Sequence, residues 1–198
     1  MSGVKWVEME IDSARDSHEP VLVEEILFWL QCKPGGVYVD CTLGYAGLAA
    51  RLLDRTAPDG ILVGIDRDAA ALAESQMRLR EVAHRVHFRH GNFCDLKALI
   101  MGSGVSRVDG VIFDLGVSSP QLDRAERGFS FREDGPLDMR MDTTQGETVA
   151  DFLARGSQSE IGEVIKNYGE ERFAHAIAKA IVAARGEGHI TNTKQLAT

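Results

Sequence analysis

Two aspartates stand at the carboxyl ends of predicted strands, which is where open α/β sheets bind their ligands. Asp66 ends the apolar run 61–66, and Asp114 ends the run that begins at residue 110. Asp66 also follows Gly44 by about 20 residues, the spacing at which an acidic residue accepts hydrogen bonds from ribose hydroxyls. A tight turn at Gly44 and a helix cap at Asp66 would explain each residue separately. Together, in this order, they favour a site for an adenosine-bearing cofactor.

The glycine turn between the first predicted strand and its helix, DCTLGYAGLA, indicates which cofactor fits. A dinucleotide-binding pattern G-x-G-x-x-G/A falls on Gly44, Ala46 and Ala49, so its middle glycine is missing. That position brings backbone close to a pyrophosphate, and we expect the Ala46 methyl group to crowd it. S-adenosylmethionine carries no phosphate, so it suits this turn better than a nicotinamide dinucleotide does. Phe93, just after the third predicted strand, is a candidate wall for the adenine, although a core aromatic would look the same.

The segment from Asp114 to Asp142 is dense in charged residues, glycine and proline, as functional loops of this length are. Its two phenylalanines, Phe129 and Phe131, argue against disorder. One interpretation is that they anchor the loop to the sheet. One interpretation of the loop's arginines is that they pair with acidic neighbours in the loop, such as Arg140 with Asp138.

The elements that must position these residues alternate between strands and helices, which predicts a doubly wound α/β fold with a parallel sheet. Four strands are predicted, at 37–41, 61–66, 86–90 and 110–116, with helices at 21–31, 43–55, 68–80 and near 95–101. Asp68 is a plausible helix N-cap. Three helices without a strand follow the loop, with capping-box spacing at Thr148 and Ser157.

A sheet of four strands looks unfinished for a nucleotide-type fold, and its fourth strand would present an open edge. We therefore expect either a truncated form or a second copy of the chain that covers this edge.

Composition narrows the class of protein further. The chain has 198 residues and a formal net charge of -8, which disfavours non-specific binding to a polyanion. It has no apolar run long enough for a membrane span and no signal-peptide pattern at its start, so we expect a cytoplasmic protein. Its three cysteines show no CxxC spacing, so we expect them to be reduced, buried thiols. The histidines have no spacing typical of metal ligands, so we expect no metal site.

Long stretches of the chain closely resemble the bacterial small-subunit ribosomal RNA methyltransferase H family, also called MraW. The resemblance begins at His18 and covers most of the chain. It runs through these segments: HEPV, VYVDCTLG, GIDRDAAAL, DLGVSSPQLDRAERGFSFREDGPLDMRMD and YGEERFAHAIAKAI. The fourth of these is the most specific.

The resemblance implies a class I S-adenosylmethionine-dependent methyltransferase that modifies N4 of a cytosine in 16S rRNA. It implies a Rossmann-like cofactor domain over 1–120 and an active-site loop with a helical subdomain over 121–198. The family's C-terminal part is absent here, so the chain by itself is expected to be of uncertain activity. The implied cofactor contacts are these: Ala46, Gly47, Leu48, Asp66, Phe93, Asp114 and Gln121. The family usually has Gly-Gly-His where this chain has Ala46, Gly47 and Leu48.

For the chemistry, we expect Asp114 to contact the acceptor amine or the cofactor. The residues that we place at the RNA substrate are Phe129, Phe131, Asp138 and Arg140. On this second interpretation of the loop, the phenylalanines receive an unpaired base and the arginines meet RNA phosphates. Two other functions remain open from the sequence. One is a nicotinamide-dependent oxidoreductase, and the other is a non-catalytic form that binds cofactor or RNA.

Overall fold

The computed structural model describes residues 21–198 and contains one parallel four-stranded sheet. The spatial order of its strands is β3, β2, β1, β4. Their bounds are β1 Val37–Asp40, β2 Ile61–Asp66, β3 Val86–His90 and β4 Gly110–Ile112. In register, Asp40 at the end of β1 lies between Gly64 on β2 and Ile112 on β4. The carboxyl ends of the strands therefore meet along one edge of the sheet.

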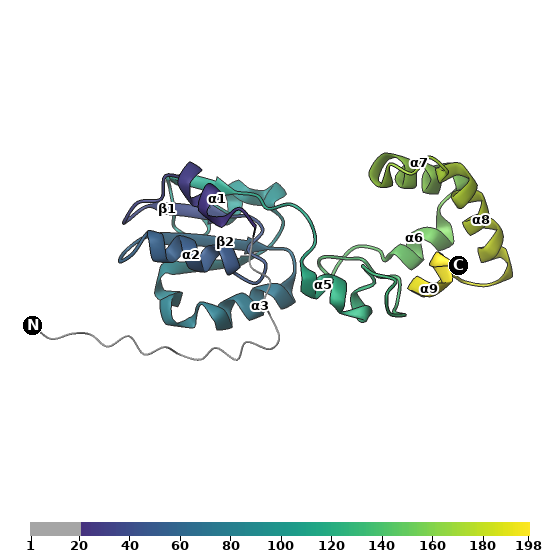
Figure 1. Cartoon of the computed structure of the whole chain (residues 1–198), viewed down its shortest axis with the longest axis horizontal. Helices are drawn as coiled ribbons and strands as arrows, with labels where there is room; N and C mark the ends of the chain where they lie inside the picture. The colour runs from purple at the N-terminus through teal and green to yellow at the C-terminus, as the bar shows by residue number, and fades with distance from the viewer. Residues whose placement is uncertain (1–20) are drawn as a thin grey trace, which may run out of the picture.

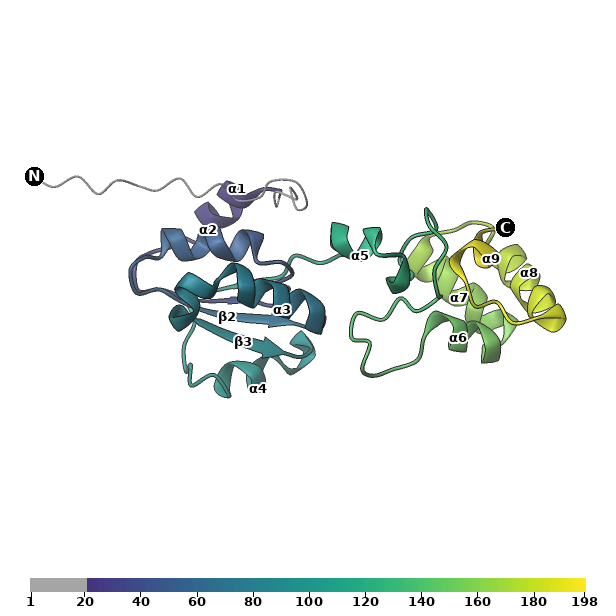
Figure 2. The same cartoon turned by 90° about the horizontal axis from the view of Figure 1, so that it is seen from below.

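Helices cover both faces of this sheet (Figure 2). One face is covered by α1 (Val23–Trp29), α2 (Gly47–Arg55), α3 (Ala69–Arg78) and the 3₁₀ segment η1 (Arg80–Arg85). The other is covered by η2 (Phe93–Asp95) and α4 (Leu96–Met101). Most of the buried side chains in this sheet are apolar, and successive residues on each strand point to opposite faces. This part of the chain, residues 21–113, is called the sheet lobe below.

The long loop, residues 114–142, leads from the sheet lobe to a second body at the other end of the molecule (Figure 1). The loop contains α5 (Ser119–Asp123) and the 3₁₀ segment η3 (Ala125–Arg127). The helical lobe, residues 143–198, contains α6 (Val149–Arg155), α7 (Gln158–Gly169), α8 (Ala174–Glu187) and α9 (Thr193–Ala197). Its core consists of Leu153, Ile161, Ala178 and Ile181, against which Leu137 of the loop packs.

The predicted α/β fold with a parallel four-stranded sheet and a helical C-terminal region is confirmed. Thr148 and Ser157 do form capping boxes, and Asp68 does cap α3. The fourth strand is shorter than predicted, because the backbone N–H of Asp114 donates to the Thr42 hydroxyl, 2.8 Å away, as the chain leaves the sheet.

The expectation that all three thiols are buried is wrong for Cys94, which is exposed, whereas Cys41 is buried. The short helices α5 and α9 were not predicted. The N-terminal expectations, on the lack of a signal peptide and on the start of the resemblance at His18, lie outside the described residues. No helix within residues 21–198 is long and apolar enough to cross a bilayer.

Candidate functional site

A pocket of about 460 Å³ opens at the carboxyl ends of β1, β2 and β4. Its size falls in the range that small-molecule sites occupy. Six of the seven predicted cofactor contacts line it: Gly47, Leu48, Asp66, Phe93, Asp114 and Gln121. The structure thus brings together residues that lie more than 70 positions apart in the sequence, since the backbone N–H of Asp114 donates a hydrogen bond to the Thr42 hydroxyl.

Asp66 holds the glycine turn in place from the end of β2. Its Oδ2 atom accepts a hydrogen bond of 2.7 Å from the Gly44 N–H, and its Oδ1 atom accepts one of 2.8 Å from the Asp68 N–H. Gly44 has φ +52°, a left-handed conformation that glycine adopts without strain. Burial raises the pKa of Asp66, while these hydrogen bonds act in the opposite direction. Each carboxylate oxygen keeps a lone pair for a further donor.

Ala46 is the one predicted cofactor contact that does not line the pocket. It is fully buried and belongs to the core under the sheet, and its φ of 60° makes it a left-handed N-cap for α2. Its methyl group therefore packs into the core, so the expected crowding of a phosphate does not occur. Gly47 and Leu48, at the start of α2, do line the pocket, and Leu48 does so from a largely buried position.

Asp40, at the end of β1, is a site residue that the sequence reasoning missed. It lines the pocket and is only 2% exposed. Its pKa is raised to about 7, chiefly by burial and also by the neighbouring carboxylates of Asp66 and Asp114, while hydrogen bonds from Thr42 oppose the shift. The signal was present, because Asp40 ends an apolar run in the same way as Asp66 and Asp114 do.

Asp114 and Phe93 form the side of the pocket nearest β4. Asp114 is exposed, and no described residue donates a hydrogen bond to its carboxylate. The Phe93 ring packs edge-on against Phe113, with ring centroids 5.6 Å apart at 90°. The site thus offers a free carboxylate beside an aromatic wall.

Another wall of the pocket belongs to α5 and the later part of the long loop. Gln121 is 6% exposed, and its Nε2 atom donates to Asp68 Oδ2 at 2.8 Å and contacts the Met141 sulfur at 3.3 Å. Its Oε1 atom accepts from the Ser118 N–H at 2.9 Å. Met141 lines the pocket as well. Gln121 is therefore fixed by the protein itself before any ligand binds.

The four residues predicted at the RNA substrate do not line this pocket. Phe131 is 71% exposed, whereas Phe129 is half-buried with the Arg127 guanidinium 5.8 Å from its ring centroid. Arg140 pairs with Asp138 through two hydrogen bonds of 2.9 and 2.8 Å, so for this arginine the local pairing holds. Arg127 differs, since it pairs with Asp68 on the sheet lobe rather than with an acidic neighbour in the loop.

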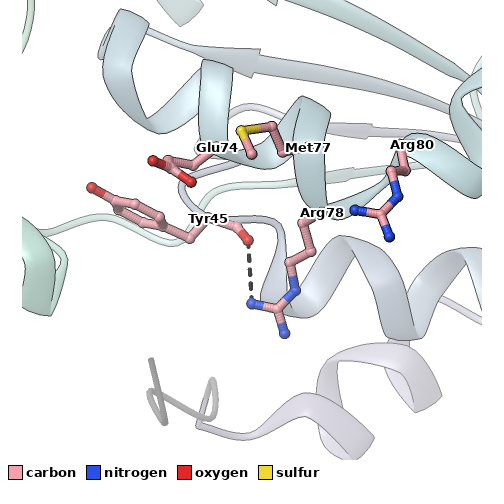
Figure 3. Close-up of a pocket in the computed structure, with 5 residues that line it drawn as sticks. All are labelled: Tyr45, Glu74, Met77, Arg78 and Arg80. Atoms are coloured by element: carbon pink, nitrogen blue, oxygen red, sulfur yellow. Dashed lines mark hydrogen bonds between the residues drawn. The ribbon is translucent and has the colours of Figure 1, made fainter. Parts of the chain in front are cut away.

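A smaller hollow of about 250 Å³ adjoins the pocket (Figure 3). Tyr45 and Arg78 line both hollows, and the Arg78 guanidinium donates a hydrogen bond of 3.4 Å to the Tyr45 carbonyl. The remaining lining residues of the smaller hollow are Glu74, Met77 and Arg80. None of the strand-end carboxylates faces it, so the larger pocket is the candidate site.

Comparison with known proteins identifies the family of the chain. Residues 15–198 match the model of the MraW methylase family. The chain belongs to this family. The protein named ribosomal RNA small subunit methyltransferase H from Azoarcus sp. (strain BH72) is 52% identical over 185 residues, which cover 93% of this chain and 58% of that protein.

The protein of the same name from Syntrophotalea carbinolica is 48% identical over 180 residues, covering 91% of this chain and 57% of that protein. This MraW-family chain thus spans a little under three fifths of the length of these relatives. A crystal structure of a SAM-dependent O-methyltransferase from Thermotoga maritima matches with a TM-score of 0.36 at 17% identity, over 38% of this chain and 29% of that one.

Proposed function

We propose that the chain binds S-adenosylmethionine in the strand-end pocket and takes part in methylating N4 of a cytosine in 16S rRNA. The observation that carries the proposal is the convergence of Gly47, Asp66, Phe93, Asp114 and Gln121 on one pocket in a chain of the MraW family. The names of its relatives suggest the substrate class, the small-subunit ribosomal RNA.

The charges of the pocket fit this cofactor. Asp40, Asp66 and Asp114 line it from three neighbouring strand ends. A sulfonium and an ammonium group would be stabilised by these carboxylates, whereas the diphosphate of a nicotinamide dinucleotide would be repelled. The pocket therefore argues against the oxidoreductase alternative on electrostatic grounds, in place of the steric argument from Ala46.

Each lining residue then has a specific task. When bound, S-adenosylmethionine supplies an electrophilic methyl group on its sulfonium. The free lone pairs of Asp66 accept the ribose hydroxyls, and Phe93 provides an apolar face for the adenine. The exposed carboxylate of Asp114 accepts a hydrogen bond from the N4 amino group and orients its lone pair. Orientation of this kind is the main contribution a protein makes to such a transfer.

The acceptor base has to leave its stack before it can reach the pocket. Phe131 is exposed on the long loop, so it is available to stack on an unpaired base, as aromatic side chains in RNA-binding proteins do. Phe129 carries less of this role because it is half-buried beneath Arg127.

Two measurements test the proposal. Calorimetric titration should show binding of S-adenosylmethionine and no binding of NAD. Small ribosomal subunits that lack the modification should then incorporate labelled methyl groups when incubated with the chain. Binding of NAD in preference to S-adenosylmethionine would refute the cofactor assignment. Cofactor binding without incorporation would support the non-catalytic alternative for this 198-residue chain.

We also propose that a second copy of the chain covers the outer edge of β4 when this chain is studied alone. No strand among residues 21–198 pairs with that edge, and Val111, Phe113 and Leu115 beside it are 36%, 49% and 70% exposed. Unpaired apolar edges favour association. Light scattering should give the mass of a dimer, and a strictly monomeric mass at high concentration would contradict this.

A further inference from the structure

A buried ion pair joins the sheet lobe to the long loop. Arg127 Nη1 lies 2.6 Å from Asp68 Oδ2, and the two side chains are 9% and 4% exposed. Every other ion pair among residues 21–198 includes a side chain that is at least 25% exposed. The pair is therefore shielded from the solvent that weakens the others.

The two oxygens of Asp68 serve different elements. Oδ1 caps α3 by accepting from the N–H groups of Ala70 and Ala71, at 3.0 and 3.4 Å. Oδ2 accepts from Gln121 Nε2 at 2.8 Å and from Arg127 at 2.6 Å. Burial by itself would raise the pKa of Asp68, but the hydrogen bonds from Gln121 and Arg127 outweigh it, so the pKa lies below the usual range. The carboxylate is thus ionised while it holds the loop.

Arg127 in turn connects the middle of the loop to its C-terminal end. Its Nη2 atom donates to the carbonyl oxygens of Arg140 and Met141, at 3.0 and 3.1 Å. The residue after it, Gly128, has φ +72°, and an added Cβ there would lie 2.3 Å from the Pro136 carbonyl oxygen. Two segments of the loop backbone therefore pass so close together at this turn that no residue with a Cβ atom fits at position 128. One guanidinium fixes the position of Met141 relative to α3.

These contacts lead directly to the pocket. Gln121 and Met141 both line it, and both are held through Asp68 or Arg127. Asp68 also donates its backbone N–H to Asp66, the proposed ribose acceptor. We propose that Asp68 and Arg127 form a latch that positions the Gln121 and Met141 wall against the cofactor pocket, so that loss of the latch weakens cofactor binding without unfolding the sheet lobe. The inference rests on the proposed function for its cofactor, and both members are positioning residues.

The alternative is that the pair only adds stability. Buried ion pairs are often no more stabilising than well-packed apolar side chains, because desolvation offsets the attraction between the charges. What such a pair does supply is a fixed geometry, since two donors must meet one carboxylate oxygen. Because Oδ1 of Asp68 caps α3 and Oδ2 binds the loop, one substitution can remove the contact with the loop and keep the helix cap.

Asp68→Asn is the test variant. The asparagine oxygen still caps α3, because Asn is as good an N-cap as Asp. Its NH₂ group then faces the donors of Gln121 and Arg127, so the latch opens. The matched control is Glu147→Gln, which removes the exposed ion pair of Glu147 with Arg155. Neither residue lines the pocket, and both lie outside the proposed machinery.

Hydrogen exchange, detected by mass spectrometry, measures the protection of the loop. Calorimetry with S-adenosylmethionine measures the cofactor Kd. In Asp68→Asn we expect amide exchange over residues 119–142 to be at least about tenfold faster, with α3 still protected, and the cofactor Kd to rise about tenfold. Glu147→Gln should change neither quantity. Arg127→Lys keeps a charge for Asp68 but cannot hold both carbonyls, so it should give an intermediate effect and serves if Asp68→Asn does not fold.

Unchanged loop exchange in both variants would overturn the latch. Faster loop exchange with an unchanged cofactor Kd would overturn its effect on the pocket. If the unmodified chain does not bind S-adenosylmethionine, the proposed function fails, while the exchange measurement still decides whether Asp68 and Arg127 hold the loop.

Discussion

The sheet lobe and the helical lobe are built from different kinds of interaction. The sheet lobe buries apolar side chains on both faces of a sheet whose strands pair across long sequence separations. The helical lobe has a small core and relies on local features, with capping boxes at α6 and α7. The pocket is lined only by the sheet lobe and the long loop. The part of the chain whose strands pair across long sequence separations therefore holds the candidate site, and no described residue of the helical lobe lines it.

The largest expected effect on stability comes from truncating one buried side chain in the core of each lobe. Leu52 and Ile161 are both 0% exposed, one in each lobe. Truncation to alanine should cost about 2–5 kcal/mol at either position. If the lobes are independent, Leu52→Ala lowers the unfolding temperature of the sheet lobe and abolishes cofactor binding, while Ile161→Ala loosens only the helical lobe. Hydrogen exchange resolved by segment reports both. Equal loss of protection in both lobes in each variant would show that they unfold as one unit.

Phe131→Ala tests whether the loop presents the base. Stacking of a base on an aromatic ring is worth about 1–3 kcal/mol, so binding of a single-stranded 16S rRNA fragment should weaken by roughly five- to 150-fold. Stability should change by less than about 0.5 kcal/mol, because the side chain is 71% exposed. The control is Tyr168→Ala on the helical lobe, where the ring is 86% exposed. Filter binding compares the two, and an equal loss for both would move the RNA surface towards the helical lobe.

Asp66→Ala tests the cofactor assignment within the sheet lobe. The variant removes the ribose acceptor and the acceptor of the Gly44 N–H. A hydrogen bond to a charged group contributes about 1.5–3 kcal/mol, so the Kd for S-adenosylmethionine should rise at least about tenfold. Asp54→Ala, an exposed position on α2, is the control. Calorimetry measures both, and an unchanged affinity in Asp66→Ala would exclude the role given to it.

The raised pKa of Asp40 predicts that the stability and cofactor affinity of the sheet lobe depend on pH, whereas the stability of the helical lobe should not. Its pKa in the folded protein is about 7, against 3.8 without burial. A raised folded-state pKa means that the protonated form favours folding, so its contribution to stability is complete below about pH 4 and is lost as the pH rises through about 7. Binding of a cationic cofactor follows the opposite direction, because the ionised carboxylate attracts it.

The Kd for S-adenosylmethionine should therefore fall several-fold, up to about tenfold, between pH 6 and pH 8. Calorimetry at pH 6, 7 and 8 measures this, with Asp40→Asn as the variant that should be flat. A slope that persists in Asp40→Asn would assign the titration to another group.

Much of this arrangement could be predicted from the sequence, and the reasons are local. Asp66 and Asp114 follow apolar runs, and Thr148 and Ser157 have capping-box spacing, so short windows of sequence suffice. Asp40 satisfies the same rule and was overlooked. The pairing of Arg127 with Asp68 was out of reach, because it joins residues 59 positions apart and acidic neighbours within the loop were equally good candidates. The direction of the Ala46 methyl group also depends on the left-handed turn rather than on residue type.

The smallest expected effect belongs to the helical lobe alone. Ser157 Oγ accepts from the Glu160 N–H at 3.2 Å, and the Glu160 carboxylate accepts from the Ser157 N–H at 2.7 Å. Ser157→Ala should therefore cost about 1 kcal/mol. Ser159→Ala, which removes only an exposed contact with Glu163, should cost much less. Exchange within α7 should rise while exchange in α2 stays constant, because the cap contributes only where it is made. An equal rise in α2 would mean that even a local feature of the helical lobe stabilises the sheet lobe, and that the two lobes are coupled through the long loop.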